Sequence, residues 1–312
     1  MTLHEISSTD YLRLFPKSQV VYNTPAFTEL NASKVKRVIR LMFESDHGKP
    51  VLGLTIGETA DGKFKAPFSA PFACFDFNKE QTAAVVQQAA DELASAFPGL
   101  QITLPPAMYS PSMNAKTQLA LLNAGARALY SDWNYHIDLT SFAPGEYASI
   151  LITGERWKLR QVMRQNFVLE PCEPLRAYEV IKINKAAHGY PLRMSAEQVV
   201  TTIGVEGPVT ADSFVLTDGA TDVAAAIIYH VAPGIAQVIY WGHIPDSPYK
   251  YVMNLLAMLT AEHYRAIGYQ ILDIGPASED GIPSLGLCEF KESIGCRCSP
   301  KPTLGFANSR NF

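Results

Sequence analysis

Two windows of this chain, residues 96–127 and 266–297, align without a gap at a constant offset of 170. A helical pattern precedes each window, at 81–97 and at 249–267, and a short apolar run, a proline-alanine turn and a second helical pattern with a glycine after it then follow. Because the element types match in the same order, the pattern predicts one structural unit that occurs twice. The identical pairs are Ala96/Ala266, Pro106/Pro276, Ala107/Ala277, Gly125/Gly295 and Arg127/Arg297.

The length of the chain agrees with two units. A chain of 312 residues is long for one hydrophobic core and sufficient for two. We therefore expect a first lobe at residues 1–150 and a second lobe at residues 151–312, with a ligand cleft between or within them. The share of hydrophobic residues, 47%, is that of an ordinary folded protein.

Charge and segment composition exclude several classes. The net charge of −4 gives no broad basic surface, so we expect no DNA partner. Residues 1–6 lack the features of a secretory signal, which predicts a cytoplasmic protein. The stretch Val223–Trp241 has no Asp, Glu, Lys or Arg and approaches the length of a membrane span. Pro233 and Gly234 at its centre instead predict two buried strands joined by a tight turn.

The cysteines do not have the spacing of a metal site. The chain has five, an odd number, which suggests reduced thiols. Cys288, Cys296 and Cys298 cluster, but they lack paired C-x-x-C spacing and no histidine follows within reach. We therefore expect no metal.

The order of predicted elements indicates an α/β fold with a mixed, mostly antiparallel twisted sheet and helices on both faces. In the first lobe we expect strands at 36–43, 51–56, about 68–77, 100–104, up to 139, and 147–153. The helices expected there run from after Ser7/Ser8 to 15, from a cap at Asn78 to 97, and over 112–123. In the second lobe we expect helices at 155–166, 174–187, 196–203, 249–267 and 285–294, and strands at 213–216, 223–229, 236–241, 270–274 and after Cys296.

This element order resembles the GNAT acyltransferase fold. The paired arrangement resembles the Fem-type peptidoglycan aminoacyltransferases and their acetyltransferase-like relatives, which carry two GNAT units in tandem. Three segments carry the likeness: Ile271–Ser278 is similar to a D-x-G strand end, Gly286–Gly295 to a G-L-x-x-F-K-x-x-x-G helix, and the basic helix 155–166 to the segment that introduces the second unit.

The resemblance implies a transferase that moves an acyl group from a thioester or aminoacyl donor to a small-molecule amine. The implied donors are acyl-CoA and aminoacyl-tRNA. The chain departs from the coenzyme A enzymes at the turn His243–Tyr249, where they have a glycine-rich loop for pyrophosphate. Here Pro245 and Pro248 have no N–H to donate, and Asp246 would repel phosphate. The matching turn of the first lobe contains Asp76. Fem-type relatives also lack this loop, but the acidic net charge weakens a tRNA partner.

Four polar residues of the second lobe are candidates for catalysis. Asp273 lies in an apolar strand, so it is either a base or substrate-orienting group at a splayed strand end, or a carboxylate satisfied by its neighbours. Glu289 and Lys291 follow on the next helix, and Lys291 either enters a cleft to bind an anion or extends to solvent. His243 is either a base near neutral pH or a turn residue. The first lobe has Thr103 and Leu121 at the positions of Asp273 and Lys291, so the chemistry is assigned to the second lobe.

The candidates for donor binding are Gly275, two aromatic residues and two arginines. Arg160 and Arg164 continue a spacing of four from Arg156, which predicts either an anion clamp or a solvated helix face. Tyr240 and Trp241 line a pocket or belong to the core.

Two alternatives to an enzyme stay open, a non-catalytic small-molecule binding protein on the duplicated scaffold and a structural partner in a larger assembly. The oligomeric state is left open.

Overall fold

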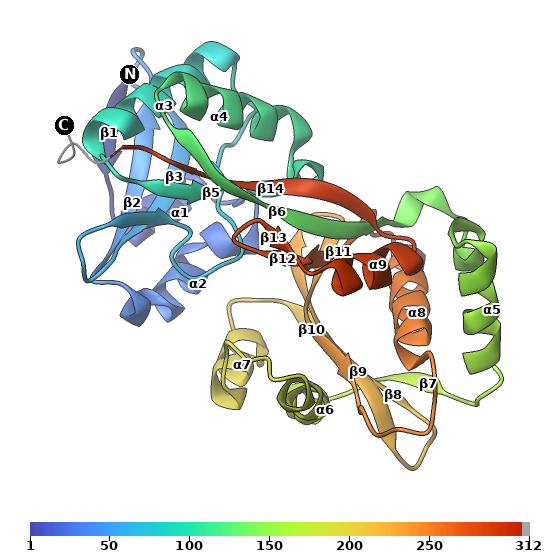
Figure 1. Ribbon diagram of the computed structural model, residues 1–312. Coiled ribbons are helices and arrows are strands. Elements are labelled where there is room, and N and C mark those ends of the chain that lie inside the picture. Colours follow the sequence, from blue (N-terminus) through green and yellow to red (C-terminus); the bar gives the residue numbers. More distant parts are fainter. Residues whose placement is uncertain (308–312) are drawn as a thin grey trace. The chain divides into compact units, whose positions relative to one another are not determined.

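The computed structural model describes residues 1–307 and divides into two compact units (Figure 1). The first unit contains Met1–Trp133, Ser278–Ile282 and residues 299–307, and the second contains Asn134–Ala277 and Pro283–Cys298. The change from one unit to the other falls inside strand β6 (Arg127–Asp138), earlier than the boundary near residue 150 that the sequence suggested. It stays a prediction that the second lobe carries the reaction and that the first lobe is structural or completes the acceptor site.

The strands follow the hydrogen-bonded order β1-β2-β3-β4-β5-β14-β6-β11-β10-β9-β8-β7. Antiparallel pairs predominate, and β4 with β5 and β10 with β11 are parallel. This confirms the predicted α/β fold with a mixed, mostly antiparallel sheet.

The first unit begins with β1 and ends with most of β14. Its elements are β1 (Thr2–Glu5), α1 (Ser8–Leu14), α2 (Pro25–Leu30), β2 (Arg37–Glu44), β3 (Pro50–Glu58), β4 (Phe64–Ala66), α3 (Ala83–Ala96), β5 (Gln101–Thr103), α4 (Pro111–Asn123) and β14 (Arg297–Gly305), with the first part of β6 and a short hairpin of β12 (Ser278–Glu279) and β13 (Ile282–Pro283).

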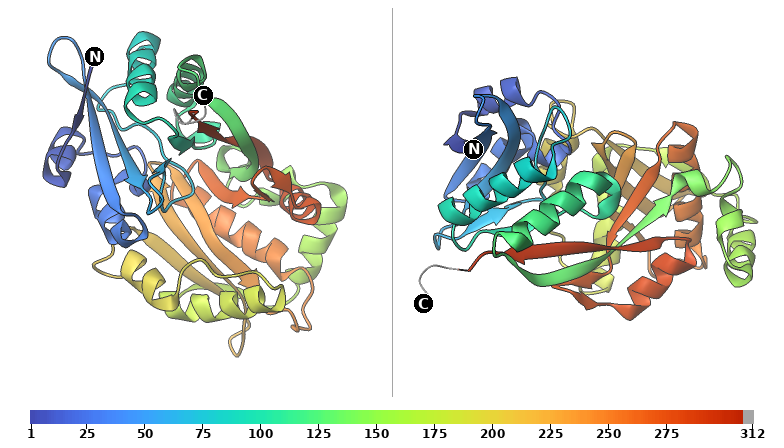
Figure 2. Two further views of the ribbon diagram at one scale, coloured as in Figure 1. Left: turned by 60° about the vertical axis from the view of Figure 1, so that its left-hand side comes forward. Right: turned by 90° about the horizontal axis from the view of Figure 1, so that it is seen from above.

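Helices α3 and α4 lie side by side, and α3 shows how the sequence positions them (Figure 2). Val86, Ala89, Ala90 and Leu93 recur at helical spacing and are buried in the hydrophobic core of this unit. The cap predicted at Asn78 is wrong, because the Thr82 hydroxyl accepts the N–H of Val85 and the helix starts at Ala83.

The second unit contains the remaining helices. Its elements are α5 (Thr153–Val162), β7 (Val168–Pro171), α6 (Pro174–Ala187), α7 (Ala196–Ile203), β8 (Ala211–Thr217), β9 (Asp222–Ala232), β10 (Ile235–His243), α8 (Val252–Ala266), β11 (Ile271–Pro276) and α9 (Leu285–Ser293).

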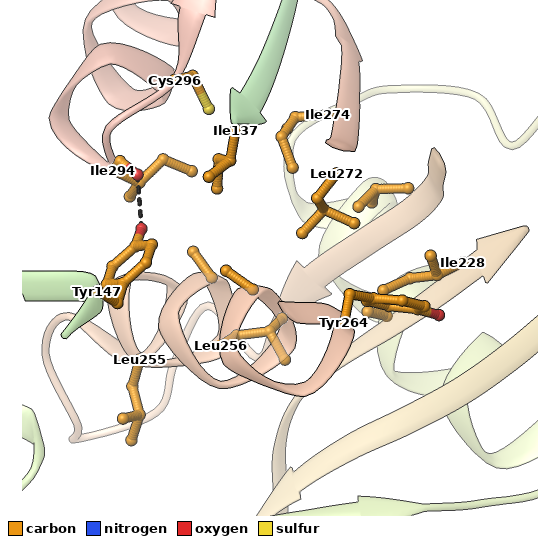
Figure 3. Packing of buried hydrophobic residues seen from close by; sticks show 14 of the residues in the cluster. Ile137, Tyr147, Ile228, Leu255, Leu256, Tyr264, Leu272, Ile274, Ile294 and Cys296 are labelled. Atoms are coloured by element: carbon orange, nitrogen blue, oxygen red, sulfur yellow. Dashed lines mark hydrogen bonds between the residues drawn. The ribbon is translucent and has the colours of Figure 1, made fainter. Parts of the chain in front are cut away.

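Helices cover both faces of the second unit's strands. Helix α6 packs on β8, β9 and β10, and α8 packs on the opposite face of β9 and β10 (Figures 1 and 2). The core on the α8 side joins residues from strands and helices far apart in sequence, among them Ile228, Leu256, Tyr264 and Leu272 (Figure 3). In the same core the Tyr147 hydroxyl donates to the carbonyl of Ile294, which ties the segment before α5 to the end of α9 (Figure 3).

The apolar stretch Val223–Trp241 forms a hairpin, as predicted. Strands β9 and β10 pair antiparallel, and the turn between them contains Gly234 at φ +74°. In the part of the chain that the structure describes, no helix has both the length and the apolar character of a membrane span.

Two predicted strands are wrong. Residues 147–153 form a 3₁₀ turn, Tyr147–Ile150, and then enter α5, because Glu262 of α8 accepts the main-chain N–H groups of Gly145 and Tyr147. Residues 68–77 form an irregular segment with one bridge, Gly53 with Asp76. Prolines at both ends of the run Pro67–Pro71 remove N–H donors that a strand would need.

Candidate functional site

The strands β10 and β11 separate soon after they begin. They pair in parallel at three positions, Ile235–Gln237 with Ile271–Asp273. Beyond this point β10 runs on to His243 paired with β9, and β11 runs on to Pro276 paired with β6. Among residues 1–307, no strand therefore pairs with the β11-facing edge of β10 past Gln237.

A bulge turns β11 away at this place. The register of β11 with β6 shifts between Asp273 and Gly275, and Gly275 has a φ of +77°. A positive φ is a conformation that glycine adopts without steric cost, and a bulge bends the strand that carries it. This explains why a glycine follows so soon after Asp273 in the sequence.

Asp273 is fully buried at the point where the two strands part. Its Oδ1 accepts hydrogen bonds from Asn134 Nδ2 at 2.8 Å and from the N–H of Gly275 at 2.9 Å. Its Oδ2 accepts one from Gln237 Nε2 at 2.7 Å. A buried carboxylate needs such donors to offset the loss of water, and amide groups supply them. The structure thus places Asp273 at a splayed strand end; its role as a base stays a prediction.

A row of polar side chains crosses the strands at Asp273. His136 of β6 and Gln237 of β10 are the register partners of Asp273 on either side, so the three side chains share one face of the sheet. His136 is half-buried. Burial lowers the pKa of His136 below its ordinary value, while the negative charge of Asp273 opposes the shift. The imidazole is therefore neutral at neutral pH and able to accept a proton.

The sequence analysis missed Asn134, His136 and Gln237. A signal for two of them was present, because polar residues alternate with apolar ones along β6 at Asp132, Asn134, His136 and Asp138. Such alternation marks one face of a strand.

Lys291 is buried, with 2% of its surface exposed, so the interpretation in which it extends to solvent is wrong. Its Nζ donates to the carbonyls of Ile274 at 3.2 Å, Gly275 at 2.8 Å and Pro276 at 2.8 Å. The ammonium also lies 5.7 Å from the ring centroid of Tyr135. Burial lowers the pKa of Lys291 to about 8. The three hydrogens of the ammonium are thus directed to main-chain oxygens of β11.

The two other candidates for catalysis lie apart from this row. Glu289 is exposed on α9, on a different face of the helix from Lys291. His243 is half-buried at the end of β10, where its carbonyl accepts Asn184 Nδ2 of α6 at 2.8 Å. Burial, and then the nearby His188, lower the pKa of His243. His243 lies six residues beyond Gln237, which is about 20 Å along an extended strand. One reacting centre cannot contact both His243 and Asp273.

The candidates for donor binding lie on β10, β11 and α5 and in the turn after α5. Tyr240 and Trp241 are half-buried in β10; the Tyr240 hydroxyl accepts the N–H of Met194, and the Trp241 ring packs against Phe290 at 6.2 Å. Arg160 and Arg164 are exposed. Helix α5 ends at Val162, so the prediction of three arginines on one helix is wrong for Arg164. Arg164 donates to Gln161 Oε1 at 3.3 Å instead.

The turn after β10 differs from its prediction in one respect. Helix α8 starts at Val252 and not at Tyr249, and Tyr251 before it has a φ of +64°. Pro245 and Pro248 therefore lie in the segment between β10 and α8, and the first turn of α8 keeps all of its main-chain N–H groups. Residues 1–307 contain no group of three or more His, Cys, Asp and Glu side chains that would hold a metal ion.

Comparisons with known proteins give structural matches alone. No family model matches the sequence, and no curated protein matches it. The structure of FemX matches with a TM-score of 0.69 at 11% identity, over 99% of this chain and 98% of FemX. The fold is that of FemX. This confirms the predicted tandem GNAT arrangement of the Fem-like group.

Other solved structures agree with the FemX fold at similarly low identity. L-PGS from Bacillus licheniformis matches with a TM-score of 0.53 at 15% identity, over 86% of this chain and 84% of that chain. A GNAT-family acetyltransferase from Colwellia psychrerythraea matches with a TM-score of 0.52 at 12% identity, over 98% and 99%. The FemX-like fold therefore extends over 99% of the chain.

Proposed function

We propose that this chain is an acyltransferase that moves an acyl or aminoacyl group from a donor to an amine, at the gap between β10 and β11. The observation that carries the proposal is the unpaired edge of β10 beyond Gln237. Attack on an acyl carbonyl creates negative charge on its oxygen, and preorganised main-chain N–H groups stabilise that charge. The edge of β10 presents such donors next to a row of polar side chains.

His136 is the proposed proton acceptor for the attacking amine. The amine must lose a proton as it forms the new bond, and a neutral imidazole is the side chain best suited to accept it near neutral pH. Asp273 is less suited, because both of its oxygens already accept hydrogen bonds. Its charge lies beside His136 and stabilises the imidazolium that forms.

The donor is proposed to be an acyl-CoA or an aminoacyl-tRNA. Both carry phosphate, and exposed guanidinium groups bind phosphate in bidentate pairs. Arg160 and Arg164 are the proposed phosphate contacts, and Gly275, Tyr240 and Trp241 the proposed groups around the acyl chain. Glu289 and His243 are proposed to contact the acceptor or the donor away from the reacting carbonyl. The proposed compartment is the cytoplasm.

This proposal is tested by a binding experiment followed by a turnover experiment. Calorimetry with acetyl-CoA, a longer acyl-CoA and aminoacyl-tRNA identifies the donor, and mass spectrometry with a panel of amines detects the product. His136→Gln is expected to lower kcat by about 100-fold or more, as loss of a general base does. The matched control is His47→Gln, at an exposed histidine in the turn between β2 and β3. A His136→Gln protein with normal turnover would rule out this base.

One observation favours a second candidate function, a non-catalytic small-molecule binding protein. The polar atoms of Asp273 and Lys291 are engaged with groups of the protein itself. Such a protein would bind a donor saturably in calorimetry and yield no product with any amine. The absence of binding across the whole panel would favour a structural partner in a larger assembly.

A further inference from the structure

The ammonium group of Lys291 contacts three consecutive carbonyls of β11. In a regular strand, successive carbonyls point to opposite sides, so one cation cannot meet three in a row. Here the backbone is bent, because Gly275 in the middle of the three has a φ of +77°. The contacts to Ile274, Gly275 and Pro276 therefore select the bent form of β11 over a straight one.

In a straight β11, alternate members of these three carbonyls would face β10 and be the acceptors of a longer β10–β11 ladder. A parallel ladder joins the N–H groups of one strand to the carbonyls of the next. Past Asp273, alternate N–H groups of β10 point to the edge that β9 leaves unpaired, while the carbonyls of β11 accept hydrogen bonds from Lys291. A buried main-chain carbonyl without a donor is unfavourable, so removal of the ammonium would favour a conformation in which other groups donate to these carbonyls.

The surroundings of Lys291 indicate that its ammonium acts on the main chain of β11 and is not one half of an ion pair. A buried cation near a buried anion usually forms an ion pair. Asp273 lies close enough to raise the pKa of Lys291, yet the ammonium donates to carbonyls and the carboxylate accepts from amides. The charged and titratable groups that act on Lys291 are Asp273, Cys288, Cys296 and Lys185, and the Tyr135 ring lies beside it.

We propose that Lys291 is a positioning residue that keeps β11 bent away from β10, and so keeps open the gap between the two strands. That the gap admits the acyl donor rests on the proposed function; that Lys291 maintains the gap does not. Without the ammonium, β11 straightens and its carbonyls on the β10 side accept hydrogen bonds from those N–H groups of Val238–Trp241 that point away from β9. The site is then closed by strand pairing.

Hydrogen–deuterium exchange of the peptide that covers residues 238–243 tests this directly. In Lys291→Met the amides of this peptide that point away from β9 are expected to exchange at least about tenfold more slowly than in the wild type, because they enter a ladder. Lys291→Arg, which keeps a cation with several donors, is expected to exchange as the wild type does. Glu289→Gln, at an exposed position on the same helix, controls for changes in α9. The peptide of β9 reports the integrity of the sheet.

Exchange that is unchanged or faster at residues 238–243 in Lys291→Met, with β9 still protected, would overturn the inference. If Lys291→Met does not fold, Lys291→Gln replaces it. Its amide has two donors in place of three, so slower exchange than in the wild type is still expected. Unchanged exchange in that variant overturns the inference equally.

Kinetics separate this inference from the proposed function. Closure lowers the fraction of protein that can bind donor, so Lys291→Met is expected to raise KM about tenfold with kcat changed less than about threefold. A fall in kcat at unchanged KM would mean that Lys291 acts on the reaction itself, against the inference. If the wild type transfers no group at all, the proposed function fails and the exchange result still decides the role of Lys291.

Discussion

Asp273 and Asp76 are buried carboxylates that accept hydrogen bonds from amides, main-chain N–H groups and a tyrosine. In the first unit, Asp76 accepts from the Tyr11 hydroxyl at 2.8 Å, the N–H of Gln19 at 2.7 Å and Asn23 Nδ2 at 3.1 Å. Burial disfavours the charged form more than these donors favour it, and the pKa of Asp76 is raised to about 6. The segment around α1 is thus attached to the first unit through a group that titrates near neutral pH.

The raised pKa of Asp76 predicts a pH dependence opposite to that of most carboxylates. The folded state binds this proton more tightly than the unfolded state, so the stabilisation is fully present below about pH 4 and is lost as pH rises through about 6. A shift of two pKa units corresponds to about 3 kcal/mol. In Asp76→Asn, which does not titrate, this contribution is absent. Urea unfolding at pH 7 and pH 4 measures the free energy of unfolding of both proteins. The value for the wild type minus the value for the variant is expected to be larger at pH 4 than at pH 7. An equal difference at both values would contradict the prediction.

At the scale of elements, the bulge in β11 decides the shape of the candidate site. Gly275 provides the bend, and its N–H donates to Asp273. Lys291 donates hydrogen bonds to the carbonyls that the bend exposes. The site therefore depends on backbone conformation as much as on side-chain type.

Two glycines near the site offer a matched test of this. A Cβ at either Gly275 or Gly286 would meet no atom within 4 Å, so neither substitution to alanine causes a clash. Gly275 has a φ of +77°, and alanine there is expected to cost about 1–2 kcal/mol. Gly286 is exposed in α9 without a positive φ, and alanine there is expected to stabilise the fold by about 0.5–1 kcal/mol. Thermal unfolding measures both, and a stability gain in Gly275→Ala would refute the role given to the bulge.

Elements with local signals could be predicted from the sequence. Helices α6 and α7 have the predicted bounds, because Pro174 starts one and the capping box of Ser195 and Gln198 starts the other. The hairpin of β9 and β10 was visible from the turn at Pro233 and Gly234. These signals lie within a few residues of the structure that they specify.

The geometry of the site depends on register, which the sequence does not show. Asp273 was found because a charged residue in an apolar strand is conspicuous, but its neighbours Asn134 and Gln237 come from strands that are distant in sequence. The destination of Lys291 was not predictable either. Helical spacing fixes the face of α9 on which Lys291 lies. The bend of β11 then decides whether main-chain carbonyls lie within hydrogen-bond distance of its ammonium.

At the scale of the whole molecule, the repeated pattern does not imply repeated chemistry. The offset of 170 matches Asp273 of β11 with Thr103 of β5. The hydroxyl of Thr103 lies 2.8 Å from that of Thr303 in β14, an uncharged pair. A polar interaction thus occupies the same position in both copies, and a carboxylate occurs in the second alone. This supports the proposal that the reaction takes place in the second unit.

A pair of substitutions tests this asymmetry. Asp273→Asn removes the charge beside His136. It also places an amide NH₂ group among the N–H groups that donate to Asp273 in the wild type, so single-turnover transfer is expected to slow by about 100-fold or more. Thr103→Val leaves the Thr303 hydroxyl without its partner, and is expected to cost about 1 kcal/mol in urea unfolding while the transfer rate changes less than threefold. Equal loss of rate in both variants would mean that the reaction needs both matched positions, and that the second unit does not act alone. An unchanged rate in Asp273→Asn would remove that carboxylate from the mechanism.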